Sequence, residues 1–163
     1  DGFHTAAIAA ANTMYALLQN PDAMDELRAH PDKIGAAVME ALRCEPPVIA
    51  LKRYVLRDTT YSGATIPKGT TVMMLWAAGN HDPAVFDQPA EFRLDRDLRG
   101  VTTFGGGAHI CVGRIVATML VRVLLEELHA QDIRLTLAGD DYPWIGNHLM
   151  CQMRHMPLNV QAG

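Results

Sequence analysis

Residues 104–113 read Phe104-Gly105-Gly106-Gly107-Ala108-His109-Ile110-Cys111-Val112-Gly113 and place one cysteine between a glycine-rich loop and a helical pattern. The backbone N–H groups of such a loop, and the positive end of the helix that follows, favour a thiolate over a thiol. A thiolate is a metal ligand, and glycines let the backbone approach a flat ligand closely. From these residues alone two interpretations of Cys111 stay open: a ligating thiolate, or a small buried hydrophobe.

Helical patterns lie on both sides of this loop. Residues 3–19 are rich in alanine, uncharged and apolar all round, which predicts a buried helix. Asn20 and Pro21 predict an N-cap and the first turn of a second helix, which extends to about Ala29. A third helix is expected over residues 31–44, and a strongly helical pattern over residues 112–128 places Ile115, Met119, Val123 and Leu124 on one face.

Short strands and loops are expected elsewhere. The periodicity over residues 48–72 indicates short strands and hairpins, and residues 80–107 indicate a long ordered loop, which is usually functional in a compact domain. Strand patterns in the tail cover residues 133–137, 149–154 and 158–160. The expected fold class is therefore mainly α with small β-sheets (α+β), in a single domain over residues 1–163.

Composition limits the classes of function. The 163 residues are 49% apolar and 20% charged, which is typical of a globular protein. With 14 Lys plus Arg against 18 Asp plus Glu, the net charge of -4 gives no footprint for nucleic acid. No apolar stretch of about 18 residues and no leader pattern occurs, so we expect no membrane partner and a cytoplasmic location. Three irregularly spaced cysteines fit neither a disulfide framework nor a zinc site.

The ten-residue pattern resembles that of the cytochrome P450 superfamily, whose Phe-x-x-Gly-x-His/Arg-x-Cys-x-Gly loop holds haem iron through its cysteine. Every defining position matches. The resemblance implies haem (iron protoporphyrin IX) as cofactor and Cys111 as the ligand of its iron, with Phe104, Gly105 and Gly113 among the cofactor-binding residues. Cys44 and Cys151 have no such context and are expected to be packing residues.

A second motif agrees with the first in order and separation. Glu40 and Arg43 are three residues apart on the third expected helix, so their side chains share a face. Taken alone, they indicate an ordinary surface ion pair. The resemblance implies that they form a buried network with Arg96 and that this network braces the haem-binding loop.

The two propionates of a haem need cations or hydrogen-bond donors. The resemblance implies that His109, two residues before the cysteine, and Arg53, at the start of the first hairpin, fill this role. An alternative for Arg53 is a solvated strand charge, because Lys52 and Arg57 are close to it in the sequence.

The first expected helix resembles the second half of the family's oxygen-binding helix. Gly2 and Thr5 match its signature, which implies Thr5 and the residue before it as catalytic groups. That residue is His4, where the family usually has a carboxylate that relays protons. An imidazole can also relay protons near neutral pH. Asp1 is an alternative acid, and a core contact is the alternative role for His4.

The resemblance covers essentially the whole chain but only the family's C-terminal part, so the N-terminal half of the fold is absent. It implies a haem-thiolate monooxygenase that hydroxylates C–H bonds with O2, receives electrons from a ferredoxin- or flavodoxin-type donor and takes a lipophilic small-molecule substrate. We expect this haem-binding portion to be inactive alone. Two alternatives are a truncated relic that binds haem without catalysis and a structural or interaction domain without haem.

The missing half has a physical consequence. The uncharged first helix needs apolar neighbours on all faces, and the helices that cover it in the family are absent. We therefore expect either that the chain self-associates as a homo-oligomer through residues 7–18 or that it was cut from a longer polypeptide.

Overall fold

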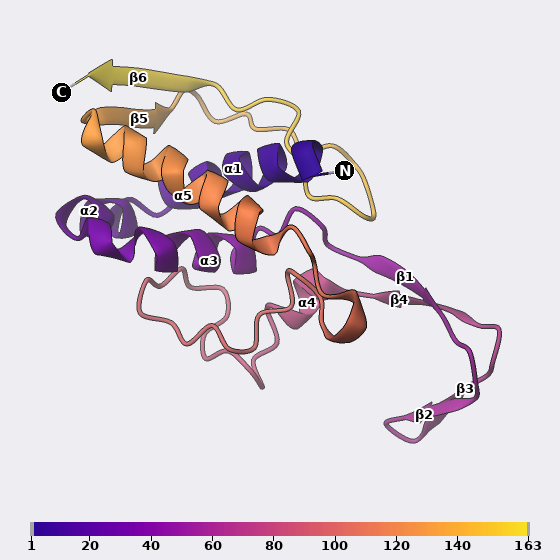
Figure 1. The fold of residues 1–163 in the computed structure, drawn as a ribbon. Coiled ribbons are helices and arrows are strands. Elements are labelled where there is room, and N and C mark those ends of the chain that lie inside the picture. Colours follow the sequence, from indigo (N-terminus) through magenta and orange to yellow (C-terminus); the bar gives the residue numbers. More distant parts are fainter. Residues whose placement is uncertain (1, 163) are drawn as a thin grey trace.

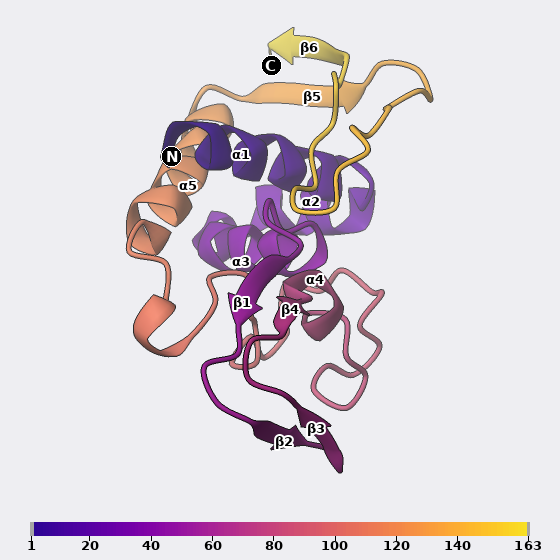
Figure 2. The same ribbon diagram turned by 90° about the vertical axis from the view of Figure 1, so that its right-hand side faces the viewer.

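Three helices form the centre of the computed structural model, which describes residues 2–162 (Figure 1). They are α1 (Gly2–Leu18), α3 (Ile34–Cys44) and α5 (Arg114–Ala130). Figure 2 shows the small sheet of β5 (Ile133–Leu137) and β6 (Leu158–Ala162) on one side of these helices and the long loop and hairpins on the other. The apolar core between the helices includes Ala9, Leu17, Val38, Leu42, Val121 and Leu125. The mixture of helices with small sheets confirms the expected fold class, and the expectation placed on Asp1 lies outside the described residues.

Helix α1 is buried over most of its length, as its composition predicts. Its side chains from Ile8 to Leu17 are buried or half-buried, because α2 (Pro21–Ala29), α3, α5 and β5 (Ile133–Leu137) all pack against it. Much of the apolar surface of residues 8–18 is therefore covered within the chain, while Ala7 is exposed, and the expected self-association through residues 7–18 stays a prediction.

The second and third helices begin and end close to the predicted positions. Pro21 is the first residue of α2, but the Asn20 side chain makes no N-terminal capping bond. Its Nδ2 instead donates to the carbonyl of Ala16 at 2.7 Å, so it closes the end of α1. A short 3-10 turn, η1 (Pro31–Lys33), leads into α3.

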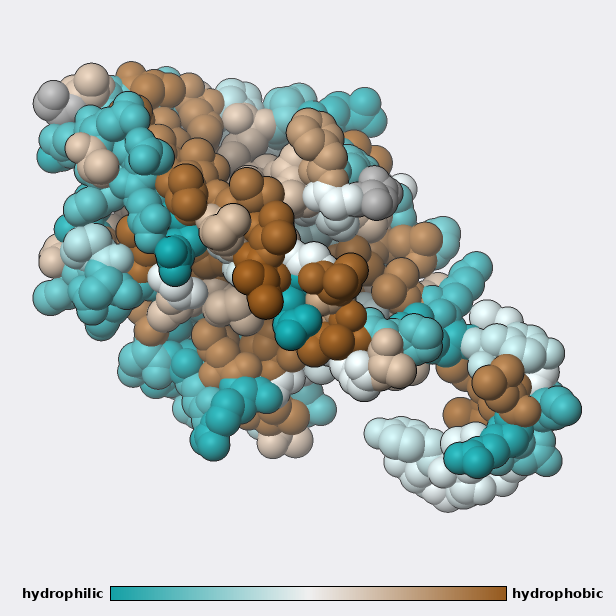
Figure 3. Space-filling model, viewed as in Figure 1, coloured by the Kyte–Doolittle hydropathy of each residue, from teal (hydrophilic) through white to brown (hydrophobic). Residues whose placement is uncertain are grey.

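Helix α5 carries apolar residues on two opposite faces, and only one face is covered. Val121 and Leu125 are buried in the core. The predicted stripe of Ile115, Met119 and Val123 is exposed, with Met119 at 48%. Figure 3 shows hydrophobic residues gathered along the line of α5. A single exposed apolar residue is ordinary, but a contiguous stripe is a surface that associates.

We therefore expect this chain to self-associate through α5. The substitutions Met119→Gln and Val123→Gln together should lower the mass measured by light scattering towards that of the monomer, because they remove apolar surface at the centre of the stripe. Arg122→Gln, on the same helix but outside the stripe, serves as the control. A wild-type chain that is monomeric at all concentrations would contradict this prediction.

The predicted hairpins form an arm that projects from the helices (Figure 1). Strand β1 (Leu51–Tyr54) pairs antiparallel with β4 (Thr71–Met74), and β2 (Thr59–Tyr61) pairs with β3 (Ala64–Ile66). The short helix α4 (Trp76–Gly79) follows the arm and opens the long loop, which contains only the 3-10 turn η2 (Gly107–His109). The arm and the loop thus connect α3 to the start of α5.

Two of the three strands predicted in the tail form. Strand β5 pairs antiparallel with β6 (Leu158–Ala162). The strand predicted over residues 149–154 is wrong, since only isolated bridges form there, at Met150 and Met153. The reason is a competing partner: Asn12 Nδ2 on α1 donates to the carbonyls of Cys151 (2.9 Å) and Glu45 (3.1 Å), and these bonds dock the tail on the helices.

The docked tail partly buries the carboxyl group of Glu45. The Cys151 Sγ donates to Glu45 Oε2 at 3.6 Å. Burial raises the pKa of the Glu45 carboxyl, and this hydrogen bond and the charge of His81 offset only part of that rise. Because the folded pKa lies above the unfolded one, the free energy of unfolding falls as pH rises from the ordinary carboxyl range through the raised pKa.

Glu45→Gln removes this titration. We expect the variant to be more stable than the wild type at about pH 8 and to lose that advantage at about pH 4. Denaturant unfolding at the two pH values measures the difference. Glu127→Gln, an exposed position on α5, is the matched control, and an advantage of Glu45→Gln that is equal at both pH values would contradict the prediction.

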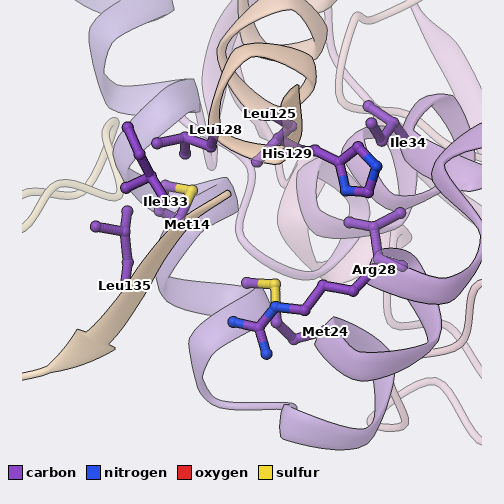
Figure 4. A pocket seen from close by; sticks show the side chains of 10 residues that line it. Met14, Met24, Arg28, Ile34, Leu125, Leu128, His129, Ile133 and Leu135 are labelled. Atoms are coloured by element: carbon purple, nitrogen blue, oxygen red, sulfur yellow. The ribbon is translucent and has the colours of Figure 1, made fainter. Parts of the chain in front are cut away.

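Apolar side chains of α1, α2, α5 and β5 surround a small hollow of about 50 Å³ (Figure 4). Arg28 and His129 also line it, and none of the predicted site residues does. It lies within the helical core, separate from the larger cavity described next. Within residues 2–162, no helix has both the length and the hydropathy needed to cross a membrane.

Candidate functional site

The loop before α5 folds back on itself and presents Cys111. The Cys111 N–H donates to the carbonyl of Phe104 at 2.9 Å, and the Gly105 N–H donates to the carbonyl of Thr102 at 2.8 Å. Gly105 and Gly107 have φ values of +66° and +62°, a conformation that disfavours other residues. The glycines are therefore needed to close the loop, and the hydrogen bond across it fixes the backbone of the cysteine.

Of the three cysteines, Cys111 is the exposed one. Burial raises the pKa of the Cys44 and Cys151 thiols to about 12, which keeps both protonated. Their burial agrees with the prediction that they are packing residues. Only the Cys111 sulfur among these three belongs to a residue that lines the large cavity.

That cavity has a volume of about 730 Å³. The first turns of α1, the cysteine loop, the start of α5 and the base of the arm surround it. It brings together seven of the predicted site residues: Thr5, Arg53, Phe104, Gly105, His109, Cys111 and Gly113. Its lining is otherwise mostly apolar, with alanines of α1 along one wall, so it suits a large apolar ligand with a few polar ends.

His4 does not join this group. It is exposed on α1 and is not among the residues that line the cavity. Thr5, the next residue, does line it. The sequence pattern correctly locates the turn of helix, but of this pair only Thr5 lines the cavity, and His4 is on the exposed side of α1.

Arg53 is half-buried and held from two sides. Its Nη1 donates to the carbonyl of Lys52 at 2.9 Å, and its guanidinium carbon lies 5.9 Å from the centre of the Trp76 ring. Trp76 also lines the cavity. Stacking on an indole orients a guanidinium and leaves its N–H groups available in the ring plane. Arg53 is therefore an ordered cation at the cavity rather than a freely solvated strand charge.

Glu40, Arg43 and Arg96 form one buried network. The Glu40 and Arg43 side chains are 0% exposed, and that of Arg96 is 5% exposed. Arg43 donates from Nε to Glu40 Oε2 and from Nη2 to Glu40 Oε1, both at 2.8 Å. Arg96 Nε donates to Glu40 Oε1 at 2.9 Å across 56 positions of sequence. The structure thus places the three predicted residues together.

The network sets the ionisation of its acid. Burial alone would raise the pKa of the Glu40 carboxyl, but hydrogen bonds from Arg43, from the Arg93 backbone N–H and from Arg96 overcome burial and hold the pKa below its ordinary value. Glu40 is therefore a carboxylate, compensated by the two arginines that bond to it. Removal of Glu40 would leave both buried arginines without their carboxylate partner, whereas removal of one arginine would leave Glu40 paired with the other.

Both arginines also bind the long loop. Their remaining N–H groups donate to backbone carbonyls, at distances from 2.6 to 3.2 Å. The acceptors are the carbonyls of Asn80, Asp87, Gln88, Pro89 and Glu91. The guanidinium of Arg43 also lies over the Phe86 ring, 5.3 Å from its centre. The loop that leads to the cysteine is thus fastened to α3.

Sequence reasoning missed three polar residues beside the site: Asn80, Thr102 and Thr103. Thr103 lines the cavity, and its Oγ1 donates to the carbonyl of Leu42 at 2.7 Å. Asn80 is buried, and its side chain bonds to both threonines. No pattern in the sequence singles them out, because each is an isolated polar residue in a loop or at a helix end.

The residues present fit a haem. Cys111 supplies the soft sulfur donor that iron accepts in haem-thiolate proteins. Arg53 and His109 line the same cavity and supply the donors that carboxylates need. Among the described residues, no three His, Cys, Asp or Glu side chains cluster as a multidentate metal site would require. A cofactor that brings its own nitrogen ligands for iron, and needs only one sulfur from the protein, would match this donor set.

The cysteine loop, its cavity and the buried network together define a haem-thiolate fold. The model of the family described as "Cytochrome P450" matches residues 34–128. Cytochrome P450 144 of Mycobacterium tuberculosis is 37% identical over 98% of this chain, and cytochrome P450 monooxygenase PikC of Streptomyces venezuelae is 34% identical over 99% of it. The chain belongs to the cytochrome P450 family, whose members bind haem.

Solved structures agree with this assignment. P450BioI, crystallised with an acyl carrier protein ligated to hexadec-9Z-enoic acid, is 31% identical and matches 96% of the chain with a TM-score of 0.91. CalO2 is 29% identical and matches 98% with a TM-score of 0.90. The chain spans about two fifths of the length of these proteins: 37% and 40% of the two relatives above, and 41% and 40% of the two structures.

Proposed function

We propose that this chain is the haem-binding portion of a haem-thiolate monooxygenase. The observation that carries the proposal is that the exposed Cys111 and the helical Thr5, which are remote in sequence, line the same large, mostly apolar cavity. Family membership supports the class of reaction, the hydroxylation of a C–H bond with O2 and electrons from a redox partner.

The cofactor would be held by residues of three elements. Cys111 would bind the iron, while Arg53 and His109 would donate hydrogen bonds to the two propionates. Phe104, Gly105 and Gly113 would lie along the porphyrin, because all three line the cavity beside the cysteine. When bound, a haem with a thiolate ligand supplies the oxidation of an unactivated C–H bond by dioxygen.

The chain's own residues would exclude water and position a hydroxyl. The alanines of α1 line the cavity and carry no group that holds water. Thr5 brings its Oγ1 hydroxyl, which can donate or accept a hydrogen bond, to the same wall. His4 is exposed beside it, and its role as a proton donor from the solvent side stays a prediction. Asn80 and Thr103 would keep the cysteine loop in place.

The partners follow from the family and the lining. We propose a ferredoxin- or flavodoxin-type electron donor, a cytoplasmic location and a lipophilic small-molecule substrate. The apolar cavity supports the substrate class. The solved relative that holds a hexadecenoic acid on its acyl carrier protein also handles a lipophilic group. Nothing in the charge distribution indicates a nucleic acid partner.

A second function, haem binding without turnover, is favoured by the openness of the cavity. Phe3 lines the cavity and is 92% exposed, so one wall faces solvent. Catalysis needs water excluded and the substrate positioned at the reacting atoms. Because the chain spans about two fifths of its relatives, we propose that it binds haem and that it is inactive by itself.

Haem titration followed by carbon monoxide spectroscopy tests the proposal. We expect the reduced chain with carbon monoxide to show the strongly red-shifted Soret band of thiolate-ligated haem. Turnover with a surrogate redox chain then separates the two functions, and we expect none for this chain alone. A chain that takes up no haem would favour a structural or interaction domain instead.

A further inference from the structure

The Asn80 side chain has hydrogen-bond partners inside the protein at both its nitrogen and its oxygen. It lies at the end of α4 and is 0% exposed. Its Nδ2 donates to the carbonyl of Arg43 (3.1 Å) and to Thr103 Oγ1 (2.8 Å). Its Oδ1 accepts from the Thr102 N–H (2.7 Å) and shares the single hydroxyl proton of Thr102, whose Oγ1 lies 2.9 Å from both this oxygen and the Trp76 carbonyl. Both donors and the acceptor oxygen of this buried carboxamide therefore have partners.

These bonds join three segments that are distant in sequence. The Asn80 carbonyl accepts from Arg43 Nη1 at 2.9 Å, so main chain and side chain are both tied to the end of α3. The Asn80 N–H donates to the carbonyl of Trp76 at 3.0 Å, within α4. The two threonines belong to the last segment before the cysteine loop. Asn80 thus connects the buried arginine network to that loop through hydrogen bonds.

The connection to Cys111 takes two further hydrogen bonds. The Thr102 carbonyl accepts from the Gly105 N–H at 2.8 Å, and the Phe104 carbonyl accepts from the Cys111 N–H at 2.9 Å. Asn80 holds Thr102 through its backbone N–H and Thr103 through its hydroxyl. The backbone just before Phe104 is therefore held by this amide, together with the bonds from Thr103 Oγ1 to the Leu42 carbonyl and from Thr102 Oγ1 to the Trp76 carbonyl.

We infer that Asn80 is a positioning residue for the Cys111 loop. Its carboxamide fixes residues 102 and 103 and so sets the place from which the Phe104 carbonyl holds the Cys111 N–H. The inference deepens the proposed function and rests on it for its meaning, since a positioned sulfur matters only to a ligand. A group that fixes the geometry around a metal ligand tunes that metal site without touching the metal.

Asn80→Asp tests this with a change of one atom. An aspartate keeps the shape and the acceptor oxygen but has no N–H, so the Arg43 carbonyl and Thr103 Oγ1 both lose their donor. The first readout needs no haem: hydrogen exchange of the Cys111 amide. We expect its exchange to be about tenfold faster or more in Asn80→Asp, while amides in the core of α3, such as that of Leu42, keep their wild-type protection.

The second readout is the haem spectrum. With haem bound, we measure the ratio of the red-shifted carbon monoxide band to the short-wavelength band of haem that has no thiolate ligand. We expect this ratio to be lower by about tenfold or more in Asn80→Asp, which is the usual size of effect when a group that hydrogen-bonds near a metal ligand is changed. Asn159→Asp, the same change at an exposed position of β6, should leave both readouts at wild-type values.

The outcomes separate this inference from the proposed function. Unchanged exchange at Cys111 in folded Asn80→Asp overturns the positioning role, whether or not the chain binds haem. Absence of haem uptake in the wild type, with faster exchange in the variant, contradicts the proposed function alone. If Asn80→Asp does not fold, Thr103→Val decides by the same exchange measurement, with Thr103→Ser expected to restore protection because it keeps the hydroxyl.

Discussion

Cys111→Ala is expected to abolish the red-shifted Soret band of the reduced, carbon monoxide-treated chain. Cys111 is the only one of the three cysteines that is exposed at the cavity, so no other thiol can replace it without refolding. Changes to the groups that hydrogen-bond to metal ligands cost up to about 100-fold in affinity, so loss of the ligand itself should lower haem affinity by more than about 100-fold. Haem titration and the carbon monoxide spectrum measure the two effects.

The matched control is Cys151→Ala. This thiol is bonded to Glu45 and does not line the cavity, so its loss should leave the spectrum unchanged. The same substitution at two thiols thus separates ligation from a general effect of cysteine loss. Persistence of the red-shifted band in Cys111→Ala would contradict the assignment of Cys111 as the iron ligand.

Glu40→Gln is expected to lower the free energy of unfolding by about 3–5 kcal/mol, the usual cost when one partner of a buried ion pair is removed. The substitution keeps the shape of the side chain, but it places an amide N–H against an arginine and leaves Arg43 and Arg96 without a compensating charge. Denaturant unfolding measures the loss. Because the folded pKa of Glu40 is lowered, the carboxylate's contribution is present above the ordinary carboxyl pKa and is lost as pH falls through the folded value.

Asp95→Asn is the matched control for Glu40→Gln. Asp95 pairs with Arg93 at 3.2 Å, but both side chains are solvent-exposed, so the same carboxyl-to-amide change should cause no measurable loss of stability. Equal effects of the two substitutions would show that burial of the Glu40 network does not matter.

The sequence predicts the helices well and the packing of their faces less well. Apolar spacing locates α5, but it cannot tell which of two apolar faces the rest of the chain covers. The stripe of Ile115, Met119 and Val123 follows the predicted spacing, yet Val121 and Leu125 are the residues in the core. The covered face is the one against which α1 and α3 pack.

The predicted strand over residues 149–154 shows a second limit. Its pattern is compatible with a strand, but the Cys151 carbonyl is occupied by the Asn12 side chain, and the Cys151 N–H donates to the Pro47 carbonyl. Competition from a side chain on a remote helix is a tertiary event that local propensity does not contain.

The site is divided in the same way. The residues at the cavity and those of the buried network occur in short patterns, so Cys111, His109 and Glu40 could be named from the sequence. The residues that hold these groups in place could not be named from the sequence. Asn80 has its role because groups from two remote segments, the end of α3 and residues 102–103, converge on one buried amide, and such convergence exists only in the folded chain. His4 shows the opposite case, a residue in a recognisable motif whose side chain lies outside the cavity.

Arg43 and Arg96 hold the long loop by its carbonyls, which every amino acid possesses. The side chains of Asp87 and Glu91 are therefore nearly irrelevant to these hydrogen bonds, and alanine at either position should be accepted with little change. Gln88 has a φ of +45°, so its position also requires a residue that tolerates the left-handed conformation. The hydrogen bonds to the two guanidinium groups depend on the spacing of the peptide units. Deletion of a single residue between Asp87 and Glu91 would move the carbonyls away from the two guanidinium groups. Homologues should therefore conserve the length of this segment more strictly than its side chains.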